Sequence, residues 1–387
     1  MSLPFVILSD SVDYPSGLGR IARDIAVQAN QLPEFRVATI GRGGRSSSRL
    51  PWPQYVLGEN DGWGETKLEE CWKDFARDEI GVLLTIWDAS RVRWLVQNDQ
   101  MPQNTIKFLN EGRFERWGYF PVDSTGPLEK LTGINADTIQ KFDRVLAYGL
   151  WGKGVLERST GRQDIEWLPH GVNFNAFQPR ERTAARMAMG VSENCELIGM
   201  VATNQTRKDW GLAFYLFNQL RKQRPGIKFW IHTDTMVRHW NLYALAADYN
   251  LGDSLLATPE GMFSDTEISH YYSACNLTIL PSSEGFGYPI VESLASGTPC
   301  IHSNYAGGAE LVPNKDWLVE PLTYRLEGQY NNLRPVWKPQ DWVNAIIACL
   351  EDPSPEEECR RSVSHLDWHE LGPVWRRWLL KGVGLGG

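Results

Sequence analysis

Residues 280–301 have the sequence LPSSEGFGYPIVESLASGTPCI, and they carry the strongest fold signal in the chain. The preceding residues 278–280 are β-branched or apolar and end at Pro281, which is typical of a buried strand. A glycine-bearing turn follows, and then an apolar stripe at helical spacing. The stripe consists of Phe286, Ile290, Val291, Leu294 and Ala295. The segment therefore predicts a strand, a turn and a helix with one side facing the core.

The predicted turn has the chemistry of a site for anions and hydroxyl groups. Glu284 and Glu292 are separated by seven residues, and Gly285, Phe286 and Gly287 directly follow the first glutamate. Backbone N–H groups at a helix N-terminus have no intrahelical partner and favour negative charge, and glycine lets a ligand approach the backbone closely. We therefore expect a diphosphate or a sugar hydroxyl on the turn. Since carboxylates accept hydrogen bonds from vicinal hydroxyls, one glutamate is expected to hold a hexose and the other a ribose.

This segment resembles the EGFG…E signature of glycosyltransferase family 4, a retaining family among the glycosyl transferases group 1. The continuation ESLASGTPCIHSNYAGGAELV resembles the rest of the signature, in frame from Ser273 to Val312. The resemblance implies a GT-B fold, with two Rossmann-like doubly wound α/β domains facing across a cleft and a C-terminal helix returning to the first domain. It also implies sugar transfer from a nucleoside-diphosphate sugar to an acceptor hydroxyl, by front-face attack with retention. The residues alone leave open an ordinary strand–turn–helix with surface glutamates.

Composition agrees with a two-domain soluble protein. A chain of 387 residues is long for one core, and 42% apolar with 22% charged residues is usual for globular proteins. No run of about 18 apolar residues predicts a membrane span. The start, MSLPFVILSD, has no basic region before its first strand, so no signal peptide is expected. Six scattered cysteines without CxxC spacing indicate reduced thiols in the cytoplasm and no zinc site.

Strand and helix patterns alternate through the first half, which predicts a doubly wound parallel sheet. Proline and glycine near residues 171–182 mark a domain boundary. We expect an acceptor-side domain at residues 1–175, a donor-binding domain at 176–361 and the returning helix at 362–387. His170 precedes this boundary, and the resemblance implies that it organises the hinge by hydrogen bonding.

Two adjacent cations are the candidates for binding the donor diphosphate. Arg207 and Lys208 directly precede a helix that is expected to begin near Asp209. Lys208 matches the lysine of the family, whereas Thr203 stands where the family usually has an arginine. Arg207 is therefore expected to supply the missing charge. Arg207, Lys208 and the amides after Glu284 would stabilise the leaving diphosphate, so that neither a metal nor another cofactor is required.

The first domain offers two glycines and two aspartates. Gly17 and Gly19 follow the first strand and open a helix, as a close ligand approach requires, and the resemblance places them near donor phosphate and acceptor. No histidine precedes His170, which excludes a catalytic imidazole from this domain. Asp88 and Asp123 each end a strand pattern. Asp123 is the preferred acid–base or orienting residue, although both also suit capping or turn positions.

The acceptor remains open at this level. Residues 36–54 carry Arg36, Arg42, Arg45 and Arg49 and no acid, which suits either a solvated loop or a site for an anionic acceptor. Such an acceptor would be a phospholipid, a phosphorylated sugar or a modified base in DNA. The net charge of −8 makes DNA a minority interpretation.

Two other function classes fit the same pattern. A nucleotide-sugar epimerase has a similar two-domain shape, and a non-catalytic module would bind a sugar nucleotide without turnover. Glu284, Glu292 and Lys208 argue against the module, while Thr203 keeps it open. The sequence does not distinguish between nucleotides, sugars or oligomeric states.

Overall fold

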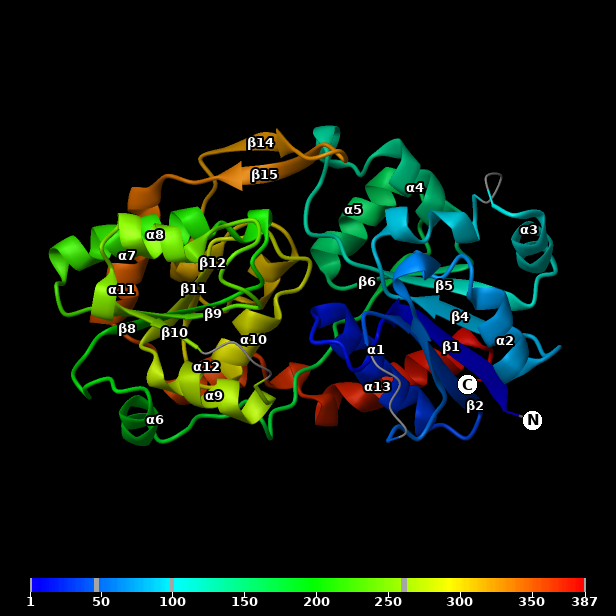
Figure 1. Ribbon diagram of the computed structural model, residues 1–387, viewed down its shortest axis with the longest axis horizontal. Helices are drawn as coiled ribbons and strands as arrows, with labels where there is room; N and C mark the ends of the chain where they lie inside the picture. Colours follow the sequence, from blue (N-terminus) through cyan, green and yellow to red (C-terminus); the bar gives the residue numbers. More distant parts are fainter. Residues whose placement is uncertain (1, 45–48, 98–100, 259–262, 386–387) are drawn as a thin grey trace. The chain divides into compact units, whose positions relative to one another are not determined.

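The computed structural model describes residues 2–44, 49–97, 101–258 and 263–385. The chain divides into two compact units (Figure 1). Unit 1 comprises Met1–Gly171 and His369–Gly387, and unit 2 comprises Val172–Trp368. Among the described residues, none of the helices combines the length and the apolar character that crossing a bilayer requires.

The unit boundaries differ by a few residues from those expected at 175/176 and 361/362. The reason is a backbone pairing between the two connecting segments. The Val172 N–H donates to the Leu366 carbonyl at 2.9 Å, and the Trp368 N–H donates to the Val172 carbonyl at 3.3 Å. The first connection therefore enters unit 2 at Val172, and the second leaves it after Trp368. Each crossing lies next to this pairing.

Unit 1 contains a seven-stranded parallel sheet with the order β3-β2-β1-β4-β5-β6-β7. Its strands are β1 (Leu3–Asp10), β2 (Phe35–Arg42), β3 (Gln54–Leu57), β4 (Gly81–Thr85), β5 (Phe114–Phe120), β6 (Arg144–Ala147) and β7 (Glu166–Trp167). Its helices are α1 (Gly17–Asn30), α2 (Leu68–Ala76), α3 (Gln103–Asn110), α4 (Gly133–Gln140), α5 (Leu150–Thr160) and α13 (Trp368–Gly382). The apolar run Phe5–Leu8 is buried throughout, because helices cover both faces of a sheet of this kind.

Unit 2 repeats this plan with a six-stranded parallel sheet of order β10-β9-β8-β11-β12-β13. The strands are β8 (Leu197–Val201), β9 (Lys228–His232), β10 (Leu255–Ala257), β11 (Leu277–Leu280), β12 (Cys300–Ser303) and β13 (Leu318–Val319), and a separate antiparallel hairpin pairs β14 (Thr323–Glu327) with β15 (Asn332–Val336). The helices are α6 (Arg182–Ala188), α7 (Trp210–Gln223), α8 (Leu242–Asp248), α9 (Asp265–Ala274), α10 (Tyr288–Ala295), α11 (Pro339–Glu351) and α12 (Glu356–Ser362). The predicted pair of doubly wound α/β domains is therefore confirmed.

The returning C-terminal helix is also confirmed, as α13 beside α1 in unit 1 (Figure 1). Leu371, Trp375 and Leu379 recur every fourth residue and are buried, which makes one apolar face. The Trp375 indole N–H donates to the Pro169 carbonyl at 2.8 Å, and its ring lies edge-on to Tyr119 at 5.3 Å. One buried side chain thus attaches the last helix to the body of unit 1.

Replacing Trp375 by alanine should destabilise unit 1, because it leaves a large cavity and an unpaired Pro169 carbonyl. We expect the free energy of unfolding to fall by about 3–5 kcal/mol. Urea denaturation followed by far-UV circular dichroism measures it. Val374→Ala on the exposed side of the same helix is the matched control and should change little. Equal denaturation midpoints for the two variants would show that α13 is not attached through Trp375.

Candidate functional site

The EGFG turn lies between β11 and α10, as the sequence predicts. Gly287 caps α10 with a φ of 110°, in the left-handed region that favours glycine. A Cβ there would also lie 2.8 Å from the Ile290 side chain. Phe286 is buried, so its side chain contributes to the core while Gly285 remains partly accessible. The turn therefore offers backbone, and not side chain, at its outer surface.

Glu284 lies inside this turn and is only 5% exposed. Its Oε1 accepts hydrogen bonds from the Lys208 ammonium and from the Ser282 hydroxyl, the latter at 2.5 Å. Its Oε2 accepts from Arg207 at 3.2 Å, and the same guanidinium donates to the Ser283 carbonyl at 2.8 Å. Three of the predicted site residues, Glu284, Arg207 and Lys208, therefore meet at one point of unit 2.

Strand order brings these distant residues together. Arg207 and Lys208 lie in the 3₁₀ turn Thr206–Lys208 after β8, and Glu284 follows β11. These two strands are neighbours in the sheet, so the loops at their carboxyl ends lie side by side. Ligands of doubly wound sheets bind at this edge.

The electrostatics keep Glu284 ionised. Burial by itself raises the pKa of this carboxyl, but attraction to Lys208 and Arg207 and hydrogen bonds from Lys208 and Ser282 outweigh burial. The net pKa lies well below the ordinary value of 4.5. Glu284 is therefore a charged acceptor of hydrogen bonds throughout the neutral range.

A glycine pair, Gly307 and Gly308, packs against the turn from the 3₁₀ turn Gly307–Leu311 that follows β12. The Gly308 N–H donates to the Glu284 carbonyl at 3.0 Å. A Cβ on Gly307 would lie 2.2 Å from the Gly285 carbonyl oxygen, and one on Gly308 would lie 2.5 Å from Nε2 of His302. Only glycine allows this approach. The backbone of the turn thus packs directly on the backbone of this glycine pair.

His302 on β12 is a site residue that the sequence analysis missed. It is fully buried, its Nδ1 lies 2.7 Å from the Leu280 carbonyl, and burial is the main cause that lowers its pKa to about 4. It is therefore neutral at pH 7, with Nδ1 donating to the end of β11. A lone histidine in a strand carries no sequence signal for this role.

Glu292 is the fifth residue of α10, just over one turn from the start of the helix, and is 7% exposed. Its Oε2 accepts a hydrogen bond from the Tyr272 hydroxyl of α9 at 3.0 Å. Tyr272 is fully buried and was also missed, because its partner is twenty residues away in sequence. Both predicted glutamates are consequently oriented by buried side chains.

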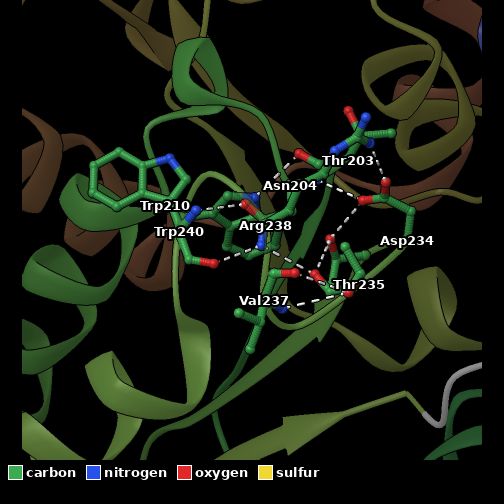
Figure 2. A network of polar contacts seen from close by, with 9 residues as sticks. Thr203, Asn204, Trp210, Asp234, Thr235, Val237, Arg238 and Trp240 are labelled. Carbon is green, nitrogen blue, oxygen red and sulfur yellow. Dashed lines mark hydrogen bonds and ion pairs between the residues drawn. The ribbon is translucent and has the colours of Figure 1, made fainter.

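A polar network centred on Asn204 fixes the loop that carries the two cations (Figure 2). Asn204 is completely buried, and its Nδ2 donates to the carbonyls of Thr235 and Trp240 at 3.1 and 2.8 Å. Its Oδ1 accepts from the Trp240 N–H at 2.9 Å, and its own N–H donates to Asp234 at 2.6 Å. The loop after β8 is thereby joined to the loop after β9.

Thr203 lies in the same network, and its carbonyl accepts a hydrogen bond from the Trp210 indole at 3.2 Å (Figure 2). It thus takes part through its backbone at the position where the resembled family has an arginine. The guanidinium that reaches Glu284 comes from Arg207.

The other predicted residues belong to unit 1. Gly17 is the exposed first residue of α1, and Gly19 packs so closely that a Cβ would lie 2.4 Å from the Ser11 carbonyl oxygen. Asp123 follows β5, is partly exposed and accepts from the Ser124 hydroxyl at 3.2 Å. Asp88 is paired with Arg91 at 3.2 Å.

His170 lies directly before the unit boundary and is buried. Its Nδ1 lies 3.0 Å from the Tyr119 hydroxyl, which itself donates to the Leu168 carbonyl at 2.6 Å. Burial first, and then the charge of Arg20, lower the pKa of His170. The neutral ring therefore donates from Nδ1 to Tyr119. In the described part of the chain, no three potential metal ligands (His, Cys, Asp or Glu) come together.

Replacing Glu284 by glutamine should lower stability most at neutral pH. The folded-state pKa is depressed, so the carboxylate contributes stability above its unfolded value of 4.5 and loses this contribution as the pH falls below that value. We expect a deficit of about 3–5 kcal/mol at pH 7 that narrows below pH 4.5. Denaturant titrations from about pH 3 to about pH 8 measure this deficit on both sides of the ordinary carboxyl pKa. The exposed Glu357→Gln is the control, and a pH-independent deficit would contradict the ion-pair account.

Replacing Asn204 by alanine should loosen the cation-bearing loop, because it leaves the Trp240 N–H and two carbonyls without their partner. A loss of about 1–3 kcal/mol in the free energy of unfolding is expected. Thr206→Ala, at an exposed position of the same loop, is the matched control. If both variants have the wild-type denaturation midpoint, Asn204 does not organise this loop.

Part of unit 2 is similar to a known protein family. Residues 181–363 match the family of glycosyl transferases group 1. A curated relative, D-inositol 3-phosphate glycosyltransferase of Segniliparus rotundus, is 24% identical over 237 residues, which are 60% of this chain and 49% of the relative. The chain therefore spans about half the length of this relative.

Solved structures match the whole chain in fold. Sucrose-phosphate synthase from Thermosynechococcus elongatus is similar with a TM-score of 0.75 and 16% identity, over 99% of both chains. HepE of Anabaena, solved in complex with UDP and glucose, has a TM-score of 0.71 and 15% identity, also over 99% of both chains. These similarities show a GT-B fold for the whole chain, while the match to glycosyl transferases group 1 covers residues 181–363.

Proposed function

We propose that this protein is a retaining, metal-independent glycosyltransferase of family 4. It would move a sugar from a nucleoside-diphosphate sugar to an acceptor hydroxyl. The observation that carries the proposal is the meeting of Arg207 and Lys208 with Glu284 beside the amides of a glycine turn. The match of residues 181–363 to glycosyl transferases group 1 supports the reaction class.

The balance of charge at this point suits a diphosphate. Two cations meet one carboxylate, which leaves an excess of positive charge next to a helix N-terminus. The Arg207 side chain is 24% exposed and can turn donors toward a ligand. As the bond to the sugar breaks, the leaving diphosphate gains negative charge. Arg207, Lys208 and the N–H groups of Gly285, Phe286 and Gly287 would stabilise it, which makes a metal ion unnecessary.

Glu284 suits the task of holding the sugar better than that of attacking it. Its oxygens accept hydrogen bonds from Lys208, Arg207 and Ser282. A carboxylate that is stabilised in this way is a weak nucleophile. A double displacement requires a free carboxylate at the anomeric carbon. We therefore favour front-face attack, in which the leaving phosphate takes the proton of the acceptor. Glu284 would bind hydroxyls of the donor sugar, and Glu292 would bind the ribose.

Unit 1 would supply the acceptor side. Gly17 and Gly19 form the loop that approaches donor and acceptor, and Asp123 orients the acceptor hydroxyl. The acceptor would be anionic, because residues 36–54 contain arginines and no acid. A modified base in DNA has less support because the net charge is −8. Cysteines 71, 275, 300, 349 and 359 are buried free thiols, which favours a cytoplasmic location.

For the donor we take UDP-glucose as the first candidate. HepE was solved with UDP and glucose, and another protein of similar fold, from E. coli, was solved with UDP-2-fluoro glucose at a TM-score of 0.67. A nucleotide-sugar epimerase would act on the same donor without an acceptor. A binding module would leave the donor intact.

A nucleoside diphosphate should raise the melting temperature of the protein, because it binds only the folded state. We expect a shift with one of UDP, GDP and ADP, abolished by Arg207→Ala combined with Lys208→Ala. Arg207→Gln alone should weaken it while leaving the buried Lys208–Glu284 pair in place. Lys222→Ala, which removes an exposed cation from α7, is the control.

The products distinguish the three function classes. Slow release of free sugar from the donor without acceptor indicates a transferase, an epimeric sugar nucleotide indicates an epimerase, and an unchanged donor indicates a binding module. Absence of any thermal shift with all three diphosphates and their sugars would overturn the donor site.

A further inference from the structure

The geometry points to a phosphate-binding site in unit 1, formed by Arg42 and Arg91 around Trp63, that receives an acceptor carrying a phosphate monoester. This inference rests on the proposed function, because it names the acceptor class of the same reaction. The site is separate from Arg207 and Lys208 of unit 2, which are proposed for the donor diphosphate.

The two arginines share one aromatic ring. The guanidinium carbon of Arg42 lies 4.2 Å from the centroid of the Trp63 ring, and that of Arg91 lies 4.4 Å from it. The Trp63 ring is itself seated edge-on against the buried Trp87 at 5.2 Å, and its backbone N–H donates to Glu65 at 2.5 Å. One indole thus carries both guanidinium groups in cation–π contact.

The position of the pair is one where doubly wound sheets bind ligands. Arg42 is the last residue of β2, and Arg91 lies in the turn Ala89–Arg91 after β4. Between them in the sheet lies β1, whose last residue, Asp10, accepts hydrogen bonds from the Trp87 indole and the Ser16 hydroxyl. All three strands present their carboxyl ends at this edge.

The same edge holds the glycine loop proposed for the acceptor. Gln54 donates to the Ser11 hydroxyl at 2.9 Å, and a Cβ on Gly44 would lie 1.9 Å from that oxygen. Ser16 caps the helix that begins with Gly17 and Gly19. Gly44 and Gln54 therefore lie directly against the loop between β1 and α1.

The hydrogen-bonding capacity of the two guanidinium groups is largely unused. Within the described ranges, Arg42 has no ion pair and no side-chain hydrogen bond, and Arg91 pairs through Nε with Asp88 alone. The Arg91 side chain is 34% exposed. Arginine presents planar forks of N–H donors that match the oxygens of a phosphate.

The acidic groups nearby are engaged elsewhere. Asp10 accepts hydrogen bonds from the Trp87 indole and the Ser16 hydroxyl, and Glu65 accepts one from the Trp63 backbone N–H. Asp61 accepts from the Gly58 N–H and the Thr66 hydroxyl. Asp88 pairs with Arg91, so the positive charge of Arg42 remains in excess for a phosphate.

A small phosphate ester fits better than a polyanion. DNA binding requires a row of cations along the backbone. Arg36, at the opposite end of β2, pairs with Glu79 at 3.0 Å and lies roughly 20 Å away along the strand. Arg45 lies outside the described residues. The two arginines therefore make a single phosphate site.

The site is tested with UDP present to saturate the donor site and inositol 1-phosphate or glucose 6-phosphate as the probe. Phosphorus-31 line broadening measures probe binding. We expect binding of at least one ester, weakened about tenfold for each of Arg42→Gln and Arg91→Gln. Arg36→Gln, the matched control on the same strand, should bind normally. The double change to lysine keeps the charges but loses the forks, and should give intermediate affinity.

Inositol and glucose without phosphate should not compete. Equal binding by Arg42→Gln/Arg91→Gln and wild type, or equal affinity for the neutral compounds, would overturn the inference. Binding of a short DNA duplex in place of either ester would overturn it in favour of the polyanion. The UDP-induced thermal shift should persist in every arginine variant of unit 1. If the wild-type protein shows no thermal shift with UDP, the result counts against the proposed function. The dependence of ester binding on Arg42 and Arg91 is measured independently of that shift.

Discussion

A carboxylate withdrawn from water is the constraint on which the architecture of unit 2 depends. Glu284 is nearly inaccessible yet ionised, and a buried charge is tolerated only when other charges and hydrogen bonds compensate its lost hydration. Lys208, Arg207 and Ser282 supply this compensation. The pairing requires that two loops separated by 76 residues meet with little freedom. The ends of β8 and β11 are consequently held in one arrangement before any ligand arrives.

Several residues that never need to touch a substrate maintain this arrangement. Asn204 joins the loop of the cations to the loop after β9, while Gly307 and Gly308 let the neighbouring backbone pack directly on the glutamate turn. Tyr272 orients Glu292 from a separate helix. In a site that stabilises developing charge, such prior orientation is useful because no reorganisation is needed during the reaction.

Unit 1 presents a different balance of burial and exposure. Its core includes the fully buried Trp72, Trp87 and Trp117, whereas Asp10 and Arg42 at the ends of β1 and β2 remain partly accessible. Arg42 and Arg91 are held mainly by contact with an indole, which allows each guanidinium to turn toward a ligand. A rigid donor side and an adaptable acceptor side would let one scaffold keep its donor chemistry while its acceptor changes.

The sequence by itself determined the strand–turn–helix around Glu284, the two doubly wound sheets and the returning helix, because apolar periodicity and glycine turns are local properties of the chain. It also selected Arg207 and Lys208, since cations before a helix are visible in sequence. Only the tertiary structure decided that Arg207 reaches Glu284 while Thr203 contributes its backbone, because that depends on the adjacency of β8 and β11. His302, Tyr272 and Asn204 escaped notice for the same reason, as their partners are remote in sequence and a lone buried polar residue has no local pattern. The pairing of Val172 with Asp367 likewise placed the unit boundaries, since two segments nearly two hundred residues apart meet there.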